Sequence, residues 1–222
     1  MKRAPRVAAV QDISGFGRCS MTVALPVLSA MGAQCCPLPT AYLSAHTAFP
    51  ELGKAAFLDL TRELEQTQEH WAALGVALDA VYSGFIGSAG QIAAIRRFYE
   101  RFRGADTVVL CDPVMGDGGR PYRTYTPDMC RAMGELAALA DVITPNLTEA
   151  ALLLGEEYAD APGSETAARA WLERLSRDGR RSVVLTGLSF TGGEIGAGYF
   201  DAADGRTGFA MARQEPAHFP GT

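Results

Sequence analysis

Two acidic residues in the middle of the chain have the types and the setting that bind a polyphosphate together with its metal ion. Asp112 directly follows 107–111, an apolar and β-branched run that predicts a strand buried on both faces. Pro113 prevents further ladder pairing, and Asp117 follows in a glycine-rich turn. A carboxylate at the carboxyl end of a buried parallel strand lies where open α/β sheets bind ligands. The alternative is an aspartate that only caps the backbone amides of a turn, and this segment alone does not decide between the two.

A second pair of polar residues begins a predicted helix further along the chain. Asn146 and Glu149 are three residues apart, which places them on one face of the first helical turn. They are predicted either to form a capping box, with Asn146 as the N-cap, or to contribute to a metal and phosphate site.

Polar residues also recur where the other predicted strands end. These strand-end residues are Asp12, Ser83, Asp112, Thr144 and Thr186. Because the carboxyl ends of parallel strands share one edge of a sheet, the recurrence favours a ligand site over unrelated turn residues. The loop at 11–18 also offers Ser14, but its G-x-G pattern lacks the third glycine of a dinucleotide-binding turn. His46, in the loop 40–50, is on its own more typical of a loop histidine than of a ligand.

The elements that must position these residues alternate between strand and helix as far as about residue 186. The predicted strands are 6–10, 34–39, 79–82, 107–111, 141–144 and 181–185. The predicted helices are 20–31, 51–73 (as one helix or two), 89–103, 127–139, 145–155 and 164–179. Two more strands, 194–200 and 207–212, flank an Asp204-Gly205 turn and predict an antiparallel hairpin. This order predicts one α/β domain over 1–222, with a doubly wound, mostly parallel sheet flanked by helices.

Composition excludes several classes of protein. The chain has 222 residues, is 48% hydrophobic and carries a net charge of −5, which argues against a nucleic-acid or anionic-membrane partner. No apolar run reaches the length of about 18 residues that a transmembrane helix needs. The apolar run near the start, 7–10, is too short for a secretory signal, so a cytoplasmic location is expected. The five cysteines do not follow metal-binding spacings and are expected to be reduced and without a catalytic role.

With these residues identified, the sequence resembles the pyridoxal/pyridoxamine kinase branch of the ribokinase-like superfamily. The resemblance covers the whole chain and depends on six segments in the family's order. These segments are 11–18 (QDISGFGR), 44–47 (SAHT), 111–117 (CDPVMGD), 144–149 (TPNLTE), 184–187 (VLTG) and 220–222 (PGT). The pair D-P-V-x-G-D and T-P-N-x-x-E is specific to the vitamin kinases of the superfamily, and the His46-Thr47 loop favours the pyridoxal type.

The resemblance implies two groups of site residues. For the vitamin, it implies contacts from Asp12, where relatives often have serine against the pyridine ring, and from Ser14, His46, Thr47 and Tyr82. For ATP, it implies Asp112, Asp117, Tyr125, Thr144, Asn146, Glu149 and Thr186. Asp112 and Glu149 would hold Mg²⁺, Asp117 and Tyr125 would belong to a closing loop, and Thr144 and Thr186 would lie by the nucleotide and a K⁺ or Na⁺ ion. Relatives are commonly homodimers, so a homodimer is expected.

The resemblance breaks off at the last two residues. In the family, Gly-Thr continues into Gly-Asp, and this aspartate is the base that takes the proton from the hydroxymethyl group. Gly221 and Thr222 would begin the anion hole for the transferred phosphate, and the catalytic aspartate would lie beyond Thr222. The expectation is therefore a fragment of a longer gene product that lacks the last helices and has little or no turnover by itself.

Three functions remain as hypotheses. The first is ATP-dependent phosphorylation of the 5′-hydroxymethyl group of pyridoxal, pyridoxamine or pyridoxine in vitamin B6 salvage. The second is hydroxymethylpyrimidine kinase activity in thiamine synthesis. The third is a non-catalytic module that binds a vitamer or a nucleotide without turnover.

Overall fold

The computed structural model describes residues 3–46, 49 and 54–215. Their contacts divide the chain into two compact units that meet in the sequence within strand β5 (Val108–Cys111), between Val109 and Leu110. No helix in the described part of the chain is both long and apolar enough to cross a membrane.

The first unit is built on four strands in the order β4-β1-β2-β3. Strand β1 pairs in parallel with both β2 and β4, and β3 pairs antiparallel with β2. The strands are β1 (Arg6–Ser14), β2 (Gln34–Leu43), β3 (Phe57–Asp59) and β4 (Ala80–Ser83), and the helices are α1 (Met21–Ala30), α2 (Thr61–Ala73) and α3 (Ala89–Phe102). Because β1 is the central strand, it is buried along almost its whole length.

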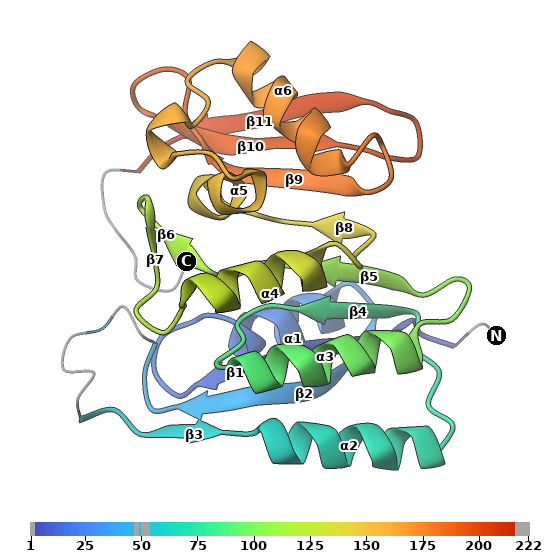
Figure 1. Cartoon of the computed structure of the whole chain (residues 1–222). Coiled ribbons are helices and arrows are strands. Elements are labelled where there is room, and N and C mark those ends of the chain that lie inside the picture. The colour runs from blue at the N-terminus through green and yellow to red at the C-terminus, as the bar shows by residue number, and fades with distance from the viewer. Residues whose placement is uncertain (1–2, 47–48, 50–53, 216–222) are drawn as a thin grey trace. The chain divides into compact units, whose positions relative to one another are not determined.

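Helix α3 supplies much of the core of the first unit. Its apolar residues are spaced three and four apart, so that they form one buried face, as the sequence predicts. Phe98 is fully buried, and Trp71 of α2 meets it edge-on at 6.2 Å between ring centroids. The two helices therefore lie side by side over the sheet of this unit (Figure 1).

The second unit contains five strands in the order β11-β10-β9-β8-β5, of which β5, β8 and β9 are parallel. Strands β9, β10 and β11 continue as antiparallel neighbours, and α6 packs against β9 and β10 (Figure 1). The strands are β8 (Val142–Ile143), β9 (Ser182–Leu188), β10 (Glu194–Phe200) and β11 (Thr207–Arg213). The helices are α4 (Pro127–Ala137), α5 (Leu147–Leu154) and α6 (Glu165–Ser176), with a 3₁₀ turn at Tyr158–Asp160. A small hairpin, β6 (Gly116–Asp117) with β7 (Arg120–Pro121), follows β5.

The predicted fold class is confirmed, since mostly parallel strands are flanked by helices and the last strands form an antiparallel pair. Several boundaries were wrong. Strands β1 and β2 continue to Ser14 and Leu43, because they pair with each other beyond the apolar runs. The helix predicted for 51–73 begins at Thr61, because Phe57–Asp59 pairs with β2 as strand β3, and 51–53 lie outside the described residues. The predicted single domain stays a prediction.

Candidate functional site

The acidic site of the second unit starts at the carboxyl end of β5. Asp112 is half-buried there, and the side chain of Thr144 hydrogen-bonds to it. Burial raises the pKa of the Asp112 carboxyl to about 6, against the opposing effect of the Thr144 hydrogen bond. Strands β5 and β8 are parallel neighbours, and the Thr144 amide donates to the Cys111 carbonyl at 3.2 Å. The two residues are therefore brought together by adjacent strand ends, as the sequence predicts.

Glu149 lies in the first turn of α5 and is the most deeply buried acid of this site. It is 3% exposed, and burial together with the charge of Asp112 raises its pKa to about 8. Its carboxylate accepts backbone hydrogen bonds from Met115 at 3.1 Å and from Asn146 at 2.8 Å, which act in the opposite direction. Two neighbouring carboxylates without a cation between them are thus both shifted toward their protonated forms.

Asn146 forms the capping box that was one of its two predicted roles. Its Oδ1 accepts from the Glu149 amide at 2.9 Å, and Glu149 in turn accepts from the Asn146 amide. Its Nδ2 also donates to the Gly116 carbonyl at 2.9 Å, and the Thr148 hydroxyl accepts from the Gly119 amide at 2.9 Å. The start of α5 therefore holds the β6–β7 hairpin at the beginning of β6 and at the turn.

This hairpin carries the exposed residue Asp117 and leads into two tyrosines. Tyr122 was missed by the sequence analysis, although the structure places its phenol in the field of Glu149, Asp117 and Asp112. Burial and these three carboxylates raise the pKa of Tyr122 to about 12. Tyr125, which the resemblance assigns to the ATP site, is buried behind Tyr122 and lines a separate groove. The sequence signal that could have identified Tyr122 as a site residue is its position just after the glycine-rich turn that carries Asp117. No helical or strand periodicity marks this tyrosine.

Thr186 in β9 completes the cluster at the strand ends. Its amide donates to the Pro145 carbonyl at 2.9 Å and its hydroxyl reaches the same oxygen at 3.4 Å. Asp112, Thr144 and Thr186 thus lie at the ends of β5, β8 and β9, next to Asn146 and Glu149 at the start of α5, whereas Asp117 lies on the β6–β7 hairpin. By contrast Ser83, another strand-end residue, is buried in the first unit against the Tyr99 hydroxyl at 2.5 Å.

The residues present fit a magnesium ion. Among the described residues, no three or more His, Cys, Asp or Glu side chains cluster as a complete metal cage. Mg²⁺ retains waters and takes one or two carboxylates together with substrate phosphates, so Asp112 and Glu149 are a sufficient protein contribution. Burial raises the pKa of both carboxyls, with the charge of Asp112 adding to the effect at Glu149, and a bound divalent cation would favour their ionised forms.

The candidate vitamin residues belong to the first unit. Asp12 and Ser14 are buried next to each other at the end of β1, and the Ser14 hydroxyl donates to Asp12 Oδ2 at 3.0 Å. His46 is half-buried, and its amide donates to the Phe16 carbonyl at 2.9 Å. Tyr82 is partly buried and packs against the apolar cluster formed by Ala9 of β1 and Met21 and Ala24 of α1. Thr47, Gly221 and Thr222 lie outside the described residues.

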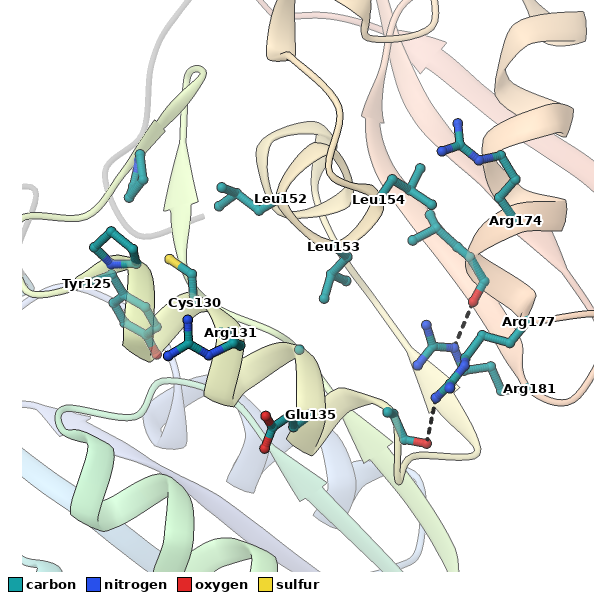
Figure 2. Close-up of a pocket in the computed structure, with 15 residues that line it drawn as sticks. Tyr125, Cys130, Arg131, Glu135, Leu152, Leu153, Leu154, Arg174, Arg177 and Arg181 are labelled. Atoms are coloured by element: carbon teal, nitrogen blue, oxygen red, sulfur yellow. Dashed lines mark hydrogen bonds between the residues drawn. The ribbon is translucent and has the colours of Figure 1, made fainter.

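A groove of about 770 Å³ lies between α4, α5 and α6 of the second unit (Figure 2). It is lined by apolar side chains of α4 and α5 and by arginines such as Arg174, Arg177 and Arg181. Of the predicted site residues, Tyr125 alone lines it, so the groove is distinct from the acidic site.

Comparison with known proteins gives a consistent set of relatives. The family profile described as phosphomethylpyrimidine kinase matches residues 25–221. A pyridoxal kinase from Deinococcus radiodurans is 32% identical over 192 residues, which cover 82% of this chain and 62% of that protein. The chain thus spans less than two thirds of that relative.

Two solved structures share both fold and sequence with the chain. A protein from Bacteroides thetaiotaomicron, described as a phosphomethylpyrimidine kinase and crystallised with pyridoxal, has a TM-score of 0.91 and 39% identity, covering 99% of this chain and 76% of that one. The pyridoxal kinase of Lactobacillus plantarum has a TM-score of 0.85 and 33% identity, covering 98% of this chain and 75% of that one.

Proposed function

Since this chain belongs to the phosphomethylpyrimidine kinase family, we propose that its activity is ATP-dependent phosphorylation of pyridoxal, pyridoxamine or pyridoxine at the 5′-hydroxymethyl group. The observation that supports the proposal is the proximity of Asp112, at the end of β5, to Glu149, in the first turn of α5, with raised pKa values for both. Relatives described as pyridoxal kinases, and a similar structure that holds pyridoxal, favour a B6 vitamer as the acceptor.

The proposed roles follow from the geometry of the second unit. Asp112 and Glu149 would hold Mg²⁺, which neutralises phosphate charge when it is bound. Asn146 would act through the hairpin, because its amide nitrogen is already engaged by the Gly116 carbonyl. Asp117 would be carried toward the phosphates by the same hairpin. Phosphoryl transfer depends mainly on charge neutralisation and alignment, which an arrangement of fixed carboxylates can provide.

An ADP-release assay tests the proposal, with each of the three vitamers and the longest product that the gene encodes. Turnover that requires both a vitamer and Mg²⁺ is expected, and no turnover with any vitamer would contradict the proposal. Vitamer binding without turnover by the longest gene product would instead favour a non-catalytic binding module.

Hydroxymethylpyrimidine is the alternative acceptor, because the matching family profile is described by a pyrimidine substrate. Competition between the pyrimidine alcohol and pyridoxal in the same assay separates the two. The use of Mg²⁺ with K⁺ or Na⁺ and the cytoplasmic location stay predictions.

The homodimer expected from the sequence is also a proposal, and the outer face of α1 supports it. Val23, Val27 and Met31 follow one another at intervals of four residues, and Met31 is 77% exposed. The opposite face of α1 is apolar too, with Met21 and Ala24 buried, and a helix that is apolar on all sides is typical of a buried position. No Asp, Glu, Lys or Arg occurs from Cys19 to Pro50. A second copy could therefore pack its own α1 there without like-charge repulsion.

Replacing Val27 with aspartate is expected to convert the dimer to a monomer in light-scattering chromatography, because two carboxylates would face each other across the two-fold axis. The control is Leu74→Asp at the end of α2, an apolar residue that is more exposed than Val27 and should leave the dimer intact. Both variants should keep the helical circular dichroism of the unchanged chain. A monomeric unchanged chain at every concentration would contradict the proposed interface.

A further inference from the structure

Asp12 is a buried carboxylate without a cation. It is 4% exposed at the end of β1, and its hydrogen bond comes from the neutral hydroxyl of Ser14. No Arg, Lys or His among the described residues forms an ion pair with it. A carboxylate removed from water calls for a positive charge and several hydrogen bonds to replace its hydration, and the hydrogen bond found for Asp12 is the one from the Ser14 hydroxyl.

Gln11, the preceding residue, gives an independent indication that a ligand is missing. It is 3% exposed, and its Nε2 is buried without a hydrogen-bond partner. Its amide rests against Gly84, where an added Cβ would lie 3.2 Å from Gln11 Cδ, so the amide is held at the ends of β1 and β4. Buried polar groups in native proteins nearly always have a partner, so this donor calls for an acceptor from outside the chain.

The loop after β1 adds two apolar rings. Phe16 and Phe49 are in ring contact at 5.1 Å between centroids. Gly17 has φ 94°, and a Cβ on it would lie 3.0 Å from the Phe49 ring and 3.1 Å from His46. A glycine therefore lets the loop 15–18 approach these side chains closely. In the sequence, the stretch that follows this loop contains no Lys or Arg from Cys19 to Pro50.

We propose that the Asp12 carboxylate pairs with a positively charged nitrogen of the substrate, while Gln11 Nε2 donates to a substrate oxygen. The site would thereby select heteroaromatic alcohols in a cationic form over neutral ones. This inference rests on the proposed function, because it names the charge state of the same substrate. The charge can come from the ring nitrogen or from an aminomethyl group, and these two sources share the chemistry that Asp12 recognises.

Calorimetric binding to the chain of 222 residues tests the inference with pyridoxamine, pyridoxine and a neutral analogue whose ring nitrogen is replaced by C–H. Asp12→Asn is expected to weaken pyridoxamine binding about 10–100-fold, because it removes one partner of a desolvated ion pair, and to leave the neutral analogue unaffected. An equal loss for pyridoxine supports the inference with the ring nitrogen as the source. A loss for pyridoxamine alone supports it with the amine as the source.

The matched control is Asp106→Asn, which removes the same charge from an exposed site of the first unit and should bind every ligand as the unchanged chain does. Asp12→Asn should also unfold at the same temperature or higher, because an uncompensated buried charge is lost. If Asp12→Ser is as tight as the unchanged chain for all ligands, or if Asp106→Asn is weakened equally, the inference is overturned. If the unchanged chain binds no vitamer at all, it is the proposed function that fails.

Gln11→Met provides a second readout. It should weaken vitamer binding about tenfold and leave the unfolding temperature nearly unchanged, since the amide donor has no partner to lose in the free chain. A sharp fall in the unfolding temperature would show that the amide is already paired, and would overturn the role given to Gln11.

Discussion

Between pH 5 and pH 8, the chain free of divalent cations should lose about 4 kcal/mol of its free energy of unfolding. The pKa of Glu149 is about 8 in the folded chain, whereas an ordinary glutamate titrates near 4.5. Over this range the unfolded chain releases its proton while the folded chain retains it, so stability falls as the pH rises. Asp112, with a pKa of about 6, contributes in the same direction at the acidic end. Denaturant unfolding at a series of pH values measures the slope.

Added Mg²⁺ should reverse most of this loss at pH 8, because a cation favours the ionised forms of both carboxylates. Glu149→Gln should flatten the pH dependence, although it is expected to be less stable at pH 5 because an amide cannot accept from both Met115 and Asn146. The control is Glu173→Gln on the exposed face of α6, which should keep the slope of the unchanged chain. A flat profile for the unchanged chain would contradict the burial of uncompensated charge at this site.

Arg181→Ala should lower the free energy of unfolding by about 3 kcal/mol. Arg181 is 7% exposed, and its Nε donates to the Leu175 carbonyl at 2.7 Å, a hydrogen bond drawn in Figure 2. Its Nη1 donates to the Ala137 carbonyl at 2.6 Å. These carbonyls lie at the ends of α6 and α4, where helix dipoles favour a cation. Burial and the neighbouring charge of Arg177 lower the pKa of Arg181 to about 10, which remains well above neutral pH. The charged guanidinium thus links the C-terminal ends of α4 and α6 by hydrogen bonds.

Arg177 offers a matched comparison four residues earlier. It is exposed, and its Nη1 reaches the Ala138 carbonyl at 3.5 Å, so Arg177→Ala should cost less than about 0.5 kcal/mol. The Arg177→Ala substitution also removes a positive charge that lies beside Arg181. Equal losses for the two variants in urea unfolding would mean that the helix-end hydrogen bonds of Arg181 do not stabilise the second unit.

Local patterns were sufficient for much of the fold. The spacing of Ile92, Ile95 and Phe98 predicted α3, and Ser88 indeed accepts from the Gln91 amide at its start. The capping box of Asn146 and Glu149 was visible for the same reason, since both partners lie within one helical turn.

The features that were missed depend on distant partners. The β6–β7 hairpin is held by hydrogen bonds with the side chains of Asn146 and Thr148. These partners lie about thirty residues later in the chain, so a short window of sequence around the hairpin does not contain them. The segment of β3 was predicted to be helical because Phe57 and Leu60 continue the three-residue spacing of apolar residues that leads into α2. In the structure Phe57 instead pairs with Leu43 of β2. The polar end of β1 has no apolar signal, although Gln11, Asp12 and Ser14 are buried where β1 continues to pair with β2.

The anchoring of the β6–β7 hairpin on the start of α5 has a consequence for how this part of the molecule moves. Fraying of the first turn of α5 would release the hydrogen bonds to Met115, Gly116 and Gly119 at the same time. The helix start and the hairpin therefore form one cooperative opening unit rather than a flexible flap beside a rigid helix. A substitution at Asn146 is consequently expected to alter the dynamics of Asp117 through the Gly116 hydrogen bond, without direct contact between the two side chains.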